Sequence, residues 1–148
     1  IFCTIRFITN YGKRIYNQKL YKMSTTILKK KADAIFSTYI RLKYADENLD
    51  VKCFTCDKVT PYKKIQNGHF YSRGILSLRY DEQNCRPQCY GCNIAKSGNY
   101  IEYYKRLEKE IGKGGMDYLE YKRHQIKKMD KLDYQDLIDF YTQKVADL

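Results

Sequence analysis

The chain has 148 residues, which is enough for one domain of ordinary size. Charged residues make up 30% and hydrophobic residues 43%, a composition typical of a globular chain and not of a disordered one. The formal net charge of +11 comes from 28 Lys and Arg against 17 Asp and Glu, and it predicts attraction to polyanions such as nucleic acid. No apolar run approaches the ~20 residues that span a bilayer, so we expect a cytoplasmic protein without a membrane partner.

The first 22 residues contain five basic side chains and no acidic one. They show little helical or strand periodicity, and Arg6 interrupts the apolar opening, so we do not interpret it as a secretory signal. We expect residues 1–22 to be a basic arm or an extension that the fold does not need, and residues 23–148 to form a single domain.

A helix is expected over residues 24–45, where apolar side chains recur at steps of three and four. Ser24, Thr25 or Thr26 is suited to cap its first turn. The apolar stripe consists of Leu28, Ala32, Ile35, Phe36, Tyr39 and Ile40.

From residue 50 to residue 99 the chain changes to short segments, turns and cysteines. Residues 62–80 are expected to form two short strands around a loop at residues 72–74. A helix should follow from Asn99 and end at Gly112. Two further helices are expected over residues 115–129 and 132–148, the last with Asp133 as its N-cap.

Two CxxC units, separated by 32 residues, contain Cys53, Cys56, Cys89 and Cys92. Each CxxC turn directs both of its sulfur atoms at one point, and two such turns complete the tetrahedron that Zn²⁺ prefers. Because protein ligands fill all four positions, the zinc would be structural and not catalytic.

Two alternatives to zinc remain open at this stage. The four thiols could be free and buried, or the same ligands could hold an iron–sulfur cluster. Cys3 and Cys85 lie outside the CxxC spacing, and Cys85 is most simply a small buried apolar residue.

Three residues around the cysteines match a known catalytic pattern. His69 lies between the CxxC units in "NGHFYSRG", Asn84 precedes the second unit and Asn93 directly follows it. This arrangement resembles the HNH, or His-Me finger, endonucleases. The stretches "GHFYSRG", "LRYDEQNC", "QCYGCN", "KSGN" and "EYY" are further similar to the NinG (Rap) family of phage recombination proteins, over roughly residues 24–120.

The resemblance implies an α+β fold. A zinc-stapled ββα core over about residues 50–112 would be flanked by an N-terminal helix and by C-terminal helices over residues 113–148. It also implies a metal-dependent endonuclease that hydrolyses phosphodiester bonds in branched DNA, such as Holliday junctions and D-loops. The products would carry 5′-phosphate and 3′-hydroxyl ends, and a phage-encoded protein would act in the cytoplasm of the host cell.

The chemistry of phosphodiester hydrolysis suits these side chains. Neutral His69 can take a proton from the attacking water, and Asn93 offers an amide oxygen to a catalytic Mg²⁺ or Mn²⁺. Asn84 would hold the His69 loop through backbone hydrogen bonds. The alternatives are a packing role for His69 and an N-cap role for Asn93. The other histidine, His124, lies in a helical stretch and is expected to be a plain surface residue.

One position departs from the wider HNH pattern. Many members have Asp or His just before the catalytic histidine, whereas this chain has Gly68. Asn93 is then the one firm protein ligand, with Asp81 and Glu82 as uncertain helpers. A single neutral oxygen holds Mg²⁺ poorly, so we expect the ion to bind weakly until DNA phosphates join it.

Basic side chains near the motif are candidates for contacts with phosphates, which position a duplex without reading its sequence. They are Arg73, Arg79, Arg86 and Lys96. The alternative function is a non-catalytic zinc-stapled module that binds DNA or RNA. Paired nicks in branched DNA would suit a homodimer, with the C-terminal helix either at its interface or packed on its own domain.

Overall fold

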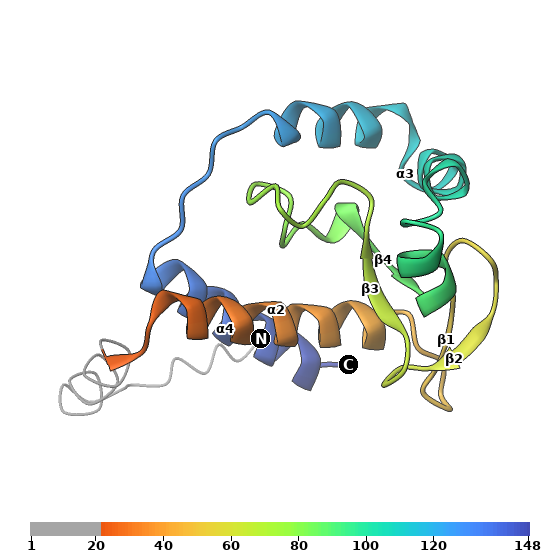
Figure 1. Ribbon diagram of the computed structural model, residues 1–148. Helices are drawn as coiled ribbons and strands as arrows, with labels where there is room; N and C mark the ends of the chain where they lie inside the picture. The colour runs from red at the N-terminus through yellow and green to blue at the C-terminus, as the bar shows by residue number, and fades with distance from the viewer. Residues whose placement is uncertain (1–21) are drawn as a thin grey trace, which may run out of the picture.

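The computed structural model describes residues 22–148 as a mixed α/β structure (Figure 1). The expected basic arm therefore lies outside the described residues except for Lys22, and so does Cys3. The elements in chain order are α2 (Thr25–Lys43), β1 (Asp50–Lys52), β2 (Val59–Pro61), β3 (Gln66–His69), the 3-10 turn η1 (Glu82–Asn84), β4 (Cys85–Gln88), the π-helical turn η2 (Gly91–Ala95), α3 (Tyr100–Arg123) and α4 (Lys131–Ala146).

Helix α2 follows the expected pattern. Ser24 is its N-cap, and its hydroxyl accepts a hydrogen bond from the backbone N–H of Ile27 at 3.3 Å. The side chains of the predicted stripe are buried, with Ile35 partly buried beside them. The C-terminal helix and the central strands pack against this buried face of α2.

Helix α4 packs along α2 and not away from the domain (Figure 1). Tyr141 contacts Phe36 edge-on with ring centroids 4.9 Å apart. The N-cap of α4 is Asp130, so the predicted N-cap at Asp133 is wrong. Asp133 instead lies one turn inside, where its carboxylate accepts a hydrogen bond from the backbone N–H of Asp130 and completes a capping box.

The prediction of two strands within residues 62–80 is half right. Strand β3 is present, but its antiparallel partner is β4, with Asn67 opposite Pro87 and His69 opposite Cys85. Residues 72–81 fold into turns because a buried hydrogen-bonding residue, Asn84, ties this loop together.

A second sheet, β1 with β2, was not predicted. It is a short hairpin in which Val51 lies opposite Thr60, and its loop carries the first CxxC unit. Strands of three residues show too few alternations to be recognised from sequence. Phe54 of the loop donates its backbone N–H to Pro87 at 2.8 Å, which joins the hairpin to β4.

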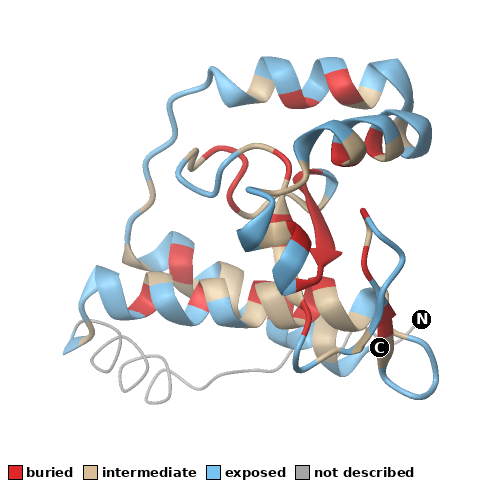
Figure 2. Ribbon diagram, turned by 45° about the vertical axis from the view of Figure 1, so that its right-hand side comes forward, coloured by how far each residue is buried: buried red, intermediate tan, exposed pale blue. Residues whose placement is uncertain are grey.

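Helix α3 is broken at Gly112, whose positive φ of 68° few other residues adopt. The first helix thus ends where the sequence predicted. The second ends at Arg123 instead of residue 129, since Ile126 finds no surface to pack on and is 94% exposed. Strand β4 is buried along its whole length and lies in the middle of the molecule (Figure 2). Within residues 22–148 no helix is long and apolar enough to cross a membrane.

Candidate functional site

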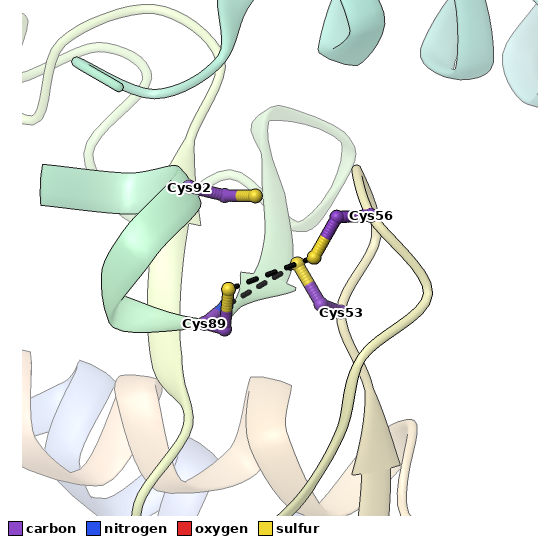
Figure 3. Close-up of side chains that lie close together, drawn as sticks. All are labelled: Cys53, Cys56, Cys89 and Cys92. Carbon is purple, nitrogen blue, oxygen red and sulfur yellow. Dashed lines mark hydrogen bonds between the residues drawn. The ribbon is translucent and has the colours of Figure 1, made fainter. Parts of the chain in front are cut away.

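The four cysteines of the two CxxC units converge, and their sulfur atoms all lie within 4.8 Å of one another. Cys53 and Cys56 come from the β1–β2 loop, whereas Cys89 directly follows β4 and Cys92 lies in η2 (Figure 3). The Sγ atoms of Cys56 and Cys89 are 3.7 Å apart. A tetrahedron with Zn–S bonds of about 2.3 Å has S···S edges of about 3.8 Å, so the donor set fits Zn²⁺.

Hydrogen-bond donors surround these sulfur atoms. The backbone N–H of Cys89 points at Cys53 Sγ at 3.3 Å, and the Asn99 amide lies 3.9 Å from Cys92 Sγ. Burial alone would raise the pKa of Cys53, but hydrogen bonds from Cys89 and Thr55 outweigh it and lower that pKa. The thiolate that a metal ion requires is therefore favoured at Cys53, whereas burial and the neighbouring thiols raise the pKa of Cys56.

The segment around Cys89 fixes the start of η2. The backbone N–H groups of Cys92 and Asn93 both donate to the Cys89 carbonyl, at 3.1 and 2.9 Å. Gln88, which is fully buried, donates to Thr55 Oγ1 and to the Gly98 carbonyl. A metal ion at the cysteines would thus set the position of Asn93 through the neighbouring residue.

A cavity of about 470 Å³ opens between α2, β3 and η2, the turn that contains Cys92 of the cysteine cluster. His69 and Asn93 both line it, so the structure brings the two predicted catalytic side chains to one concave surface. The other lining residues come from α2, β3, the 72–79 loop, η2 and the turn after it, and are Asp33, Phe36, Ser37, Asn67, Ser72, Arg73, Arg79, Ile94, Ser97 and Gly98.

His69 is held by hydrogen bonds to backbone groups, of which that to Arg79 is the stronger and that to Asn67 the weaker. Its Nε2 lies 3.1 Å from the backbone carbonyl oxygen of Arg79. A carbonyl only accepts, so Nε2 carries the proton of the neutral ring and Nδ1 is left with a lone pair. Burial lowers the pKa of His69, against a smaller opposing effect of the Arg79 carbonyl, so the ring is neutral at pH 7.

Asn84 is fully buried and ties both ends of the loop after His69. Its Oδ1 accepts from the backbone N–H of Tyr71 at 2.8 Å. Its Nδ2 donates to the carbonyls of Tyr71 and Leu78, at 2.9 and 3.2 Å. These bonds are of the kind that the sequence assigned to Asn84, and they hold the loop that supplies the Arg79 carbonyl to His69.

The side chain of Asn93 is oriented by strand β3. Its Nδ2 donates to Gln66 Oε1 at 2.8 Å, which leaves Oδ1 as the free end of the amide. Asn93 lies within η2, so it is not the cap of α3; that position belongs to Asn99.

The four basic candidates separate into two kinds. Arg73 is exposed, and no described residue pairs with its guanidinium at the rim of the cavity. Lys96 is also exposed, but it lies at the cysteine cluster beside Lys58 and Lys64. Both remain available to a polyanion.

Arg79 and Arg86 are structural instead. Arg86 is 3% exposed, pairs with Glu110 at 2.9 Å and donates to the Cys85 carbonyl, so its predicted phosphate contact is revised. Arg79 lines the cavity but is 8% exposed, and both edges of its guanidinium are occupied by Asp33 and by the Arg73 carbonyl. Sequence distance alone could not distinguish these two arginines from the exposed pair.

The two residues suggested as additional metal ligands, Asp81 and Glu82, lie outside the cavity. Asp81 pairs with Lys122 at 2.5 Å, and Glu82 is bonded to Lys43 and Lys144. His124 is exposed and bonds to Glu120, as expected for a surface residue.

Sequence reasoning missed two polar residues of the cavity, Asp33 and Asn67. Asp33 lies on α2 beside the apolar stripe, and an acidic side chain at that position could have indicated a polar site. Asn67 precedes His69 by two residues, a spacing that places both side chains on one face of a strand.

Comparison with known proteins decides the family. The family model described as "Bacteriophage Lambda NinG protein" matches residues 10–148. The chain belongs to the NinG family. The chain is 33% identical over 98 residues to the ninG protein of Salmonella phage P22 and 32% identical over 92 residues to that of Escherichia phage 933W.

The similarity to individual NinG proteins is partial on both sides. It covers 64% of this chain and 46% of the P22 protein, and 62% of this chain and 43% of the lambda protein, to which it is 30% identical. The chain therefore spans less than half the length of the curated relatives it matches. No solved structure matches this chain.

Proposed function

We propose that this NinG family member is a metal-dependent, structure-specific DNA endonuclease of the HNH type. The observation that carries the proposal is the shared cavity of His69 and Asn93, positioned by a cysteine cluster that fits a structural zinc. The order of strand β3, strand β4 and η2 around them is the order expected of a ββα unit, which supports the proposal. Branched recombination intermediates, namely Holliday junctions and D-loops, are the substrates that the sequence resemblance implies.

His69 acts as the general base in this proposal. Its Nε2–H is bound by the Arg79 carbonyl, so Nδ1 is the atom that accepts a proton from the attacking water. Asn84 maintains that geometry by holding the backbone of Tyr71 and Leu78. The lowered pKa of His69 keeps the base unprotonated at neutral pH.

The remaining groups orient the substrate. Asn93 Oδ1 is the oxygen offered to Mg²⁺ or Mn²⁺, since Gln66 occupies its Nδ2. When bound, the ion would stabilise the charge on the scissile phosphate and on the leaving oxygen. Arg73, at the rim of the cavity, is placed to contact a neighbouring phosphate. The exposed lysines at the metal centre, among them Lys96, extend the positive surface.

A second candidate is a zinc-stapled DNA- or RNA-binding module without catalysis. An exposed ring beside the lysines favours it, because Tyr90 is 63% exposed and such rings stack on unpaired bases. This reading uses the cysteines and the basic surface but leaves His69 and Asn93 without a role.

One experiment separates the two functions. The full chain is incubated with an end-labelled four-way junction and with a linear duplex of the same sequence, with Mg²⁺ or with EDTA. The nuclease proposal expects nicks in the junction alone, dependent on Mg²⁺, with 5′-phosphate and 3′-hydroxyl ends. Junction binding without nicks would favour the module and refute the nuclease.

A further inference from the structure

Strand β3 presents its side chains in alternation, and this explains why glycine occupies position 68. A Cβ atom at Gly68 would lie 2.2 Å from Gln88 Oε1, so residue 68 faces the buried amide of Gln88. Asn67 and His69 point to the other face, toward α2 and the cavity. A ligand at position 68 would therefore be misdirected, whereas position 67 shares the face of the proposed general base.

Asn67 carries an unpaired polar atom at this place. Its Oδ1 is buried and has no hydrogen-bond partner among the described residues. Asn67 lines the main cavity and also an adjoining hollow of about 380 Å³, and Asn93 and Arg73 line both as well. A buried oxygen without a donor calls for an explanation, because nearly all such atoms in proteins are paired.

The chemistry of that atom restricts what could pair with it. Burial raises the pKa of the Cys85 thiol, and the side chain of Asn67 opposes this rise, as a donor at Nδ2 would. The opposite end, Oδ1, is an acceptor, and its missing partner must be a cation or a hydrogen-bond donor. A phosphate oxygen is itself an acceptor and cannot fill that role.

We propose that Asn67 supplies a second amide oxygen to the divalent cation that Asn93 binds, in place of the ligand that Gly68 cannot provide. This inference rests on the proposed function for the presence of the cation. Two neutral oxygens still bind Mg²⁺ or Mn²⁺ weakly, so DNA phosphates complete the coordination. The cation is thereby coupled to substrate binding.

The test measures metal binding and not cleavage. Mn²⁺ is titrated into the full chain bound to a four-way junction, with the free ion followed by electron paramagnetic resonance, and in a His69→Ala background that removes hydrolysis. Asn67→Ala should weaken Mn²⁺ binding about fivefold or more. Asn67→Asp should strengthen it about tenfold and make binding measurable without DNA.

The matched control is Ser97→Asp, which adds the same charge to the same cavity at an exposed residue. It should change Mn²⁺ affinity by no more than about threefold through electrostatics alone. Circular dichroism checks the fold, and the isosteric Asn67→Asp decides the matter if Asn67→Ala does not fold. Equal effects of Asn67→Asp and Ser97→Asp, or an unchanged affinity in Asn67→Ala, would overturn the inference.

The result is separable from the nuclease proposal. Mn²⁺ binding that depends on Asn67, in a protein that cuts no DNA, would support this site and refute the nuclease. DNA cleavage by a protein whose Mn²⁺ affinity does not depend on Asn67 would support the nuclease and refute this site.

Discussion

The guanidinium of Arg79 is bound to the carboxylate of Asp33 by two hydrogen bonds, of 2.7 Å from Nε and 2.6 Å from Nη2. The carbonyl of the same arginine accepts from His69. This pair connects helix α2 to the loop that holds the proposed general base, so the helix contributes to the geometry of the cavity and not only to the core.

Asp33→Ala is expected to lower the free energy of unfolding by about 3 kcal/mol, because it leaves the largely buried Arg79 without its partner. Urea denaturation measures the change. In the double variant Asp33→Ala, Arg79→Ala the losses should be far from additive. Additive losses would show that the two side chains act independently.

The pH dependence of cleavage should report the His69 ring. Burial lowers its pKa, and the base is active only when deprotonated. Single-turnover rates should therefore rise with pH and be half-maximal below about pH 6.5, the usual value for histidine. A rate that is half-maximal above pH 7 would contradict this assignment.

Asn84→Ala should destabilise the protein by about 2–3 kcal/mol, because it leaves the backbone groups of Tyr71 and Leu78 without their partners. Chemical denaturation measures this loss, and the cleavage rate should fall as well, since the loop supplies the His69 contact. The exposed amide at position 48 is the control: Asn48→Ala should alter neither quantity appreciably. A stable but inactive Asn84→Ala protein would indicate a direct chemical role instead.

Removal of the metal should unfold the region around the cysteines, because the binding free energy of such a site, on the order of 10 kcal/mol, also stabilises the fold. We expect one zinc per chain by elemental analysis, and none in Cys56→Ser. Cys85→Ala, a change of a buried cysteine outside the cluster, should retain the zinc. Visible absorption from iron–sulfur charge transfer would refute the zinc assignment.

Arg73→Ala should change DNA binding, whereas Arg86→Ala should change stability. Arg73 is exposed and unpaired, so its loss should weaken DNA binding and reduce the slope of log K against log salt by about 1, without a change in stability. Arg86 is buried against Glu110, so its loss should reduce stability by about 3 kcal/mol. Fluorescence anisotropy and thermal unfolding distinguish the two, and equal effects would refute the division.

Helix periodicity and cysteine spacing carried most of what could be predicted. The stripe of α2, the break at Gly112 and the four converging sulfur atoms follow from local rules. The pairing of β3 with β4 does not follow from local rules. It depends on the buried amide of Asn84, which hydrogen-bonds to the loop between the two strands.

The partners of charged side chains were likewise beyond sequence reasoning. The sequence gives no reason to assign different roles to Arg79 and Arg73. The fold pairs Asp33 of helix α2 with Arg79 and not with Arg73. The same holds for the end of α3, where the apolar pattern continues to Ile126 although no surface is present to bury it.

The central claim is that His69 performs the chemistry in a cavity it shares with Asn93. Its most direct test is the single-turnover cleavage rate of a pre-bound four-way junction in Mg²⁺, with His69→Ala set against His124→Ala, the change of an exposed histidine. The expected result is a rate reduced by about 10³-fold in His69→Ala at unchanged junction affinity, with His124→Ala close to the unmodified protein. Equal rates in the two variants, or no cleavage by the unmodified chain, would contradict the account.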